Sequence, residues 1–124
     1  MNQARPALSF FRLLIASTIF LLPGGVVLAA DITPADVDKG KQIAFEPKKG
    51  NCLACHVIVG GDSPGSIGPT LVSMKARFPD REKLRQQIWD SRGNDPHTLM
   101  PPFGRFRILT DLEIERVIDY LYTL

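Results

Sequence analysis

The chain has 124 residues, with 15 basic and 13 acidic side chains and a formal net charge of +2. This length leaves room for one domain at most. So small a positive charge gives no indication of a nucleic-acid partner, and we expect none.

The first 30 residues have the organisation of a secretory signal peptide. A basic region with Arg5 and Arg12 precedes a mostly apolar run at 13–22, and small residues follow a Pro-Gly-Gly break. A membrane anchor is the alternative, but the apolar run is shorter than the roughly 20 residues that a membrane span needs. We expect cleavage after Ala29 or Ala30, which leaves residues 31–124 as the mature domain, with no membrane span. Loss of the two arginines leaves 13 basic and 13 acidic residues, so this domain is formally neutral.

The first helix of the mature domain is predicted to begin at Thr33 and Pro34. Threonine caps helix N-termini, and proline is favoured at the first helical position. Small or apolar residues then recur at helical spacing: Val37, Gly40, Ile43 and Ala44. Glycine inside a helix costs about 1 kcal/mol relative to alanine. We therefore interpret Gly40 as the point where another helix crosses closely.

Residues 52–56 read Cys-Leu-Ala-Cys-His, which is the pattern of a c-type haem attachment site. Cys52 and Cys55 would add across the two vinyl groups of haem, and His56 would turn its imidazole onto the iron. A thioredoxin-type motif would need a βαβ context, and a zinc site would need further ligands that this chain hardly has. The export signal agrees with the haem interpretation, since bacteria attach haem covalently outside the cytoplasmic membrane. We therefore expect a periplasmic protein without a structural disulfide, because the haem would use both thiols.

A loop rich in turn-forming residues follows, with Gly68-Pro69 near its end. A carbonyl near this proline is placed to accept the free Nδ1–H of His56. Such a bond fixes the tautomer of a ligating histidine and raises its basicity. An ordinary proline turn fits the spacing equally well.

An amphipathic helix is predicted over Asp80–Ser91. Its inward residues are expected to be Leu84 and Ile88. Its water-facing residues are expected to be Lys83, Arg85, Gln86 and Gln87.

The last predicted helix begins at Thr110, with Glu113 as the partner in a capping box. Its apolar residues have i, i+3, i+4, i+7 spacing: Ile114, Val117, Ile118 and Leu121. We expect this face to cross the first helix near Gly40. No alternating strand pattern appears, so the fold class is all-α.

The sequence offers three candidates for a second axial ligand of the iron: Met74, His97 and Met100. Met100 is favoured because Pro101 and Pro102 stiffen its loop without needing backbone hydrogen bonds. The other readings are a residue on a helix face for Met74 and an exposed loop residue for His97. A thioether opposite an imidazole raises the reduction potential and suits electron transfer. With both axial positions filled, a substrate has no open coordination site, and we identify no catalytic residues.

Four segments carry a resemblance to a known family: Gly50–His56, Pro64–Pro69, Met100–Gly104 and Ile108–Leu124. Their order resembles the class I cytochrome c fold. In detail they resemble SoxX, the monohaem subunit of the SoxAX cytochrome of periplasmic sulfur oxidation. The resemblance covers nearly all of the mature domain.

The resemblance implies one covalently attached haem c, with Cys52 and Cys55 as attachment residues and His56 and Met100 as axial ligands. It implies a heterodimer with a SoxA-type cytochrome, and transient contacts with a SoxYZ-type carrier protein and an electron acceptor. The SoxAX complex joins thiosulfate oxidatively to a carrier cysteine and acts as an L-cysteine S-thiosulfotransferase. This subunit would accept the electrons and would not be catalytic by itself.

Two alternatives remain at the level of sequence. The first is a free-standing cytochrome c that carries electrons to a terminal oxidase or another acceptor. The second, from another class, is a haem-free thiol-disulfide or zinc protein built on the same two cysteines.

Overall fold

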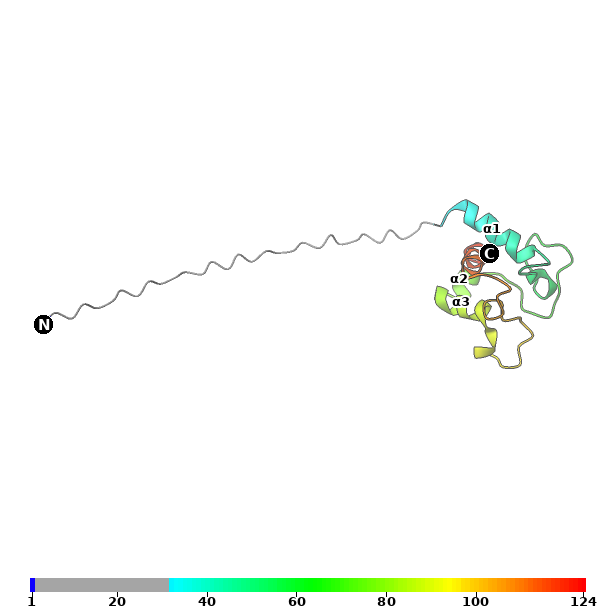
Figure 1. The fold of residues 1–124 in the computed structure, drawn as a ribbon. Helices are drawn as coiled ribbons and strands as arrows, with labels where there is room; N and C mark the ends of the chain where they lie inside the picture. Colours follow the sequence, from blue (N-terminus) through cyan, green and yellow to red (C-terminus); the bar gives the residue numbers. More distant parts are fainter. Residues whose placement is uncertain (2–31) are drawn as a thin grey trace.

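A computed structural model describes Met1 and residues 32–124 (Figure 1). Its elements, in chain order, are α1 (Pro34–Phe45), η1 (Cys52–Ala54), α2 (Met74–Arg77), α3 (Arg81–Trp89), η2 (Ser91–Gly93) and α4 (Asp111–Leu121). The described part of the chain contains no strand. The predicted all-α class is confirmed.

Helix α1 begins as its sequence predicts. The Thr33 hydroxyl accepts from the Asp36 N–H at 3.3 Å, and the Asp36 carboxylate accepts from the Thr33 N–H at 3.4 Å. Pro34 occupies the first turn. This capping box satisfies backbone donors that a helix N-terminus otherwise leaves unpaired.

Helices α1 and α4 cross closely, as Figure 1 shows for the cyan and red ends of the domain. Gly40 lies at the contact, where a Cβ atom would overlap the Arg116 carbonyl group. Next to it, the rings of Phe45 and Tyr120 meet edge to face with centroids 6.0 Å apart. The crossing predicted from Gly40 is therefore confirmed, and its glycine is required by the approach of two backbones.

Helix α4 supplies the centre of the core. It begins at the predicted capping box, with the Glu113 N–H donating to the Thr110 hydroxyl at 3.2 Å. The four residues of its predicted apolar face are all buried: Ile114, Val117, Ile118 and Leu121. The same helix therefore provides the centre of the core and the contact with α1.

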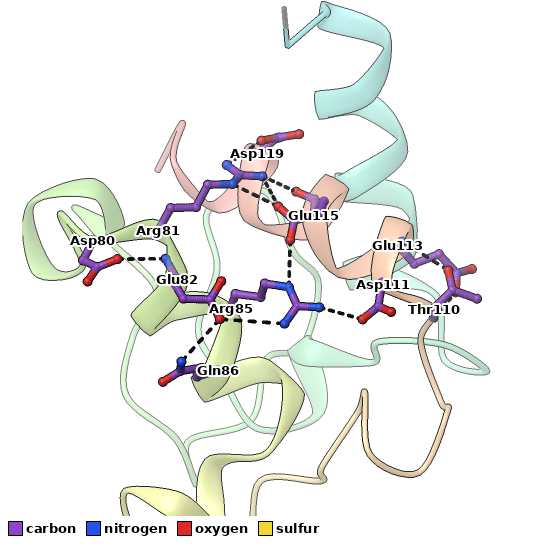
Figure 2. A network of polar contacts seen from close by, with 10 residues as sticks. All are labelled: Asp80, Arg81, Glu82, Arg85, Gln86, Thr110, Asp111, Glu113, Glu115 and Asp119. Atoms are coloured by element: carbon purple, nitrogen blue, oxygen red, sulfur yellow. Dashed lines mark hydrogen bonds and ion pairs between the residues drawn. The ribbon is translucent and has the colours of Figure 1, made fainter. Parts of the chain in front are cut away.

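Ion pairs join helices α3 and α4 (Figure 2). The Arg81 guanidinium lies 2.7 Å from Asp119 and 2.8 Å from Glu115. Arg85 reaches Glu115 at 3.0 Å and Asp111 at 2.7 Å. A guanidinium is suited to such contacts because its donors form a rigid planar fork. Close packing of the two backbones at Gly40 dominates the contact of α1 with α4, which has one ion pair between Asp36 and Arg116 at 3.3 Å, whereas several ion pairs join α3 to α4.

The predicted orientation of α3 is correct in part. Leu84 and Ile88 are buried, whereas Lys83 is exposed as predicted. The prediction was wrong for Arg85, which is half-buried against α4, and for Gln87, which is half-buried beside a cavity. Tertiary partners, which helical periodicity does not encode, explain both differences.

The predicted signal peptide, residues 1–30, lies outside the described residues apart from Met1, so it remains a prediction. Within residues 32–124, no helix combines the length and the apolar character that crossing a bilayer requires.

Candidate haem site

The Cys-Leu-Ala-Cys-His segment forms a tight turn directly after α1. The Gly50 N–H donates to the Ile43 carbonyl at 3.0 Å, which folds the chain back onto the helix. The short helix η1 follows, and the His56 N–H donates to the Cys52 carbonyl at 2.9 Å. This turn places both thiols and the imidazole on the wall of one cavity.

The two thiols are half-buried and unpaired. Burial raises the pKa of Cys52 to about 11. As a free thiol, Cys52 therefore stays protonated at neutral pH, because its surroundings disfavour the charged thiolate.

The imidazole of His56 is oriented by main-chain atoms. Its Nδ1 lies 2.7 Å from the Pro69 carbonyl oxygen. Because a carbonyl only accepts, Nδ1 carries the proton and Nε2 keeps a free lone pair. Gly68 packs against the ring so closely that a Cβ atom there would overlap it. The predicted bond near the Gly-Pro turn is confirmed, and the Pro69 carbonyl is its acceptor.

The cavity has a volume of about 680 Å³ and mostly apolar walls. This size falls within the range of about 300–1,000 Å³ found for small-molecule and cofactor sites. Its apolar lining comes from α3, α4 and the loops around them, and includes Leu71, Leu84, Ile88, Phe103, Ile108, Leu109, Val117 and Leu121. Two thiols, one imidazole with a free nitrogen and two methionine thioethers in one apolar cavity match the chemistry of a covalently bound haem.

All three predicted candidates for the second axial ligand line this cavity. Met74 is buried, and its sulfur lies 3.5 Å from the Arg77 guanidinium. His97 is exposed at the loop, where its backbone N–H donates to the Asp95 side chain at 2.9 Å. Met100 is half-buried. The choice of Met100 as axial ligand stays a prediction.

Two side chains hold the backbone of Met100. Its N–H donates to the Thr98 hydroxyl at 3.2 Å, and its carbonyl accepts from the Ser91 hydroxyl at 3.2 Å. Ser91 is fully buried. Neither residue was predicted from the sequence to contact Met100. Ser91 lies seven residues after Leu84, so helical spacing beyond the end of α3 was the available signal.

Positive charge also reaches the cavity wall. Arg77 lines the cavity and donates to the Thr70 carbonyl at 2.9 Å. Lys49 lines it as well and forms an ion pair with Glu113 at 2.7 Å. These groups suit the carboxylates of a haem. Among residues 32–124, no three histidine, cysteine, aspartate or glutamate side chains gather as a separate metal site.

The sequence profile of the family described as Cytochrome c matches residues 37–124. The chain belongs to the cytochrome c family. Membership implies a covalently bound haem c, and it agrees with the cavity and with the turn that carries the two thiols.

One solved structure extends the comparison. The crystal structure of SoxXA from P. pantotrophus contains a chain that superposes with a TM-score of 0.62 at 27% identity, covering 69% of this chain and 79% of that one. With the family match, this similarity supports a SoxX-type cytochrome and the class I cytochrome c fold.

A further relative is an uncharacterized lipoprotein of Aquifex aeolicus (strain VF5). It is 34% identical over 79 residues, which are 60% of this chain. The match spans 37% of that lipoprotein's length.

Proposed function

We propose that this chain is the electron-accepting subunit of a periplasmic SoxAX-type cytochrome. The observation that carries the proposal is the convergence of Cys52, Cys55, His56 and Met100 on one apolar cavity in a chain similar to SoxXA. A SoxA-type cytochrome is the proposed partner. In the complex, thiosulfate is joined to a cysteine of a SoxYZ-type carrier.

One haem c is proposed to fill the cavity, attached through Cys52 and Cys55. When bound, it supplies an iron that takes up and releases single electrons. His56 and Met100 would occupy both axial positions and so exclude a substrate from the iron. The Pro69 carbonyl keeps the proton on Nδ1 of His56, which leaves Nε2 for the metal.

The sulfur chemistry is assigned to the partner proteins. Forming the sulfur–sulfur bond between thiosulfate and a carrier thiol releases an electron pair and a proton. With Cys52 and Cys55 both used as thioethers, this chain keeps no thiol to hold a thiosulfate adduct, since it has only two cysteines. Its role is then to receive the electrons, one at a time.

The axial assignment is tested with three matched variants of the haem-loaded protein. Ferric haem with a methionine ligand has a weak charge-transfer band at the red end of its visible spectrum. We expect Met100→Ala to lose this band, whereas Met74→Leu and His97→Ala keep it. Persistence of the band in Met100→Ala would exclude Met100 as the ligand.

The partner assignment is tested by producing the chain together with a SoxA-type cytochrome in the periplasm. We expect the two to purify as a heterodimer, and we expect thiosulfate plus carrier protein to reduce the haem of this chain. Recovery only as a monomer that exchanges electrons with an oxidase would favour the free-standing electron carrier. Absence of a c-type pyridine haemochrome would exclude both cytochrome functions.

A further inference from the structure

Gln87 is a polar side chain on the apolar side of α3. It is half-buried and lines the cavity, between Leu84 and Ile88, which are both buried in the core. A buried amide without partners costs free energy, so its hydrogen bonds decide what it does there. Two contacts involve its amide group.

Asn94 fixes which way the Gln87 amide points. The Asn94 Nδ2 donates to the Gln87 Oε1 at 2.7 Å. Because the oxygen is engaged by a donor, the NH₂ group of Gln87 must point the other way. That nitrogen lies 4.0 Å from the sulfur of Met100. The amide therefore presents N–H donors to the sulfur.

The position of the sulfur is itself constrained by the contacts of Met100 described above. Thr98 holds the Met100 N–H, and Ser91 holds its carbonyl, each at 3.2 Å. Polar side chains thus contact Met100 at its nitrogen, its carbonyl oxygen and its sulfur. Of these three contacts, the contact to the sulfur is the one that would affect the electron density of the thioether as an axial ligand.

We propose that Gln87, oriented by Asn94, is a positioning residue that donates a hydrogen bond to the Met100 sulfur and raises the reduction potential. The inference rests on the proposed axial role of Met100. A donor on the sulfur withdraws electron density from the thioether, which disfavours the ferric state relative to the ferrous state. Hydrogen bonding around an axial ligand is one of the means by which a protein tunes a haem.

The test is spectroelectrochemical titration of the haem-loaded Gln87→Leu variant. Leucine has a similar length and removes both the donor and the acceptor. We expect the reduction potential of the haem to fall in this variant. A less polar cavity wall alone would raise the potential, so a fall identifies the loss of the N–H donor. Gln86→Leu is the matched control, because Gln86 is exposed on the same helix and its amide donates to Glu82 at 3.3 Å. An unchanged or raised potential in Gln87→Leu overturns the inference.

Asn94→Ala provides the second arm, because Asn94 is exposed and its loss spares the core. We expect a smaller fall in potential, and no further fall when Asn94→Ala is added to Gln87→Leu. An additive fall would show that Asn94 does not act through Gln87. Should Gln87→Leu yield no holoprotein, an unchanged potential in Asn94→Ala overturns the inference.

The red-edge band distinguishes a failure of the proposed Met100 ligation from a failure of the proposed role of Gln87. Wild-type protein without the band would contradict the proposed ligation by Met100. Wild-type protein with the band, combined with an unshifted potential in Gln87→Leu, would overturn only the role of Gln87.

Discussion

The two predicted axial residues are held in different ways. On one side of the site, a main-chain carbonyl accepts from His56, and a glycine leaves room for its ring. On the other side, the hydroxyls of Thr98 and Ser91 hold the backbone of Met100. A main-chain acceptor stays in place when side chains change, whereas a hydroxyl is lost with one substitution. A single substitution can therefore change how Met100 is held. The position of His56 is expected to change mainly when a larger residue is placed against its ring.

The largest effect is expected from Gly68→Ala on the His56 side. The new Cβ would overlap the imidazole, so the ring must move away from the Pro69 carbonyl. Overpacking of this kind costs about 1–3 kcal/mol. We expect a lower yield of covalent haem and a lower melting temperature, measured by pyridine haemochrome and by thermal unfolding.

Gly93→Ala is the control for this substitution, since nothing lies within 4 Å of a Cβ placed there. Equal behaviour of the two variants would mean that Gly68 does not set the position of the ring.

An intermediate effect is expected from Ser91→Ala on the Met100 side. This change leaves the Met100 carbonyl without its buried donor, which costs about 1–2 kcal/mol. We expect lower thermal stability and displacement of the axial methionine by a lower concentration of added imidazole, followed by absorbance. Ser66→Ala is the control, because Ser66 is exposed. If Ser91→Ala bound imidazole like the wild type, the Ser91 hydroxyl would not hold Met100 in place, and the contrast between the two sides of the site would be wrong.

The smallest effect is expected from Glu113→Gln, which breaks the ion pair that ties Lys49 to α4. The Lys49 hydrogen bond, followed by the Thr110 backbone, holds the pKa of Glu113 below its ordinary value of 4.5. A carboxyl with a lowered folded-state pKa stabilises the protein above its unfolded-state pKa. That contribution is lost as the pH falls through the folded-state value.

We therefore expect Glu113→Gln to weaken the protein by less than about 1 kcal/mol at neutral pH. Below pH 4.5 its stability should fall less steeply than that of the wild type, as measured by denaturant unfolding across pH. Asp62→Asn, in an exposed loop, is the control. Parallel stability curves for wild type and Glu113→Gln would contradict the assignment of the ion pair.

Features that depend on neighbouring residues were predictable from the sequence. The capping boxes at Thr33 and Thr110 and the apolar face of α4 involve residues within a few positions of each other. The Cys-Leu-Ala-Cys-His motif also follows from short spacing, whereas the spacing of Gly68-Pro69 fitted an ordinary turn as well as an acceptor for His56, and the structure decides for the acceptor. Gly40 predicted a long-range contact because a close helix crossing gives a packing reason for a glycine in mid-helix.

Features that depend on which distant partner is present were not predictable. Arg85 looked like a solvated residue because the two carboxylates that draw it onto α4, Asp111 and Glu115, lie more than twenty positions further along the chain. Gln87 was predicted to face water because its side chain is polar. It nevertheless lies three residues after Leu84, on the buried face of the helix. A polar residue that helical spacing places on an apolar face is therefore a candidate functional residue.

The crossing of α1 and α4 has a consequence for folding. It joins residue 40 to residue 116, and both proposed attachment residues and both proposed axial residues lie within the loop that it closes. The entropy cost of closing a loop grows only slowly with its length, but domains that rely on contacts this distant in sequence fold more slowly than domains built from local contacts. Both walls of the cavity therefore depend on one contact between the ends of the domain. Separation of α1 from α4 would therefore loosen both walls of the cavity at the same time.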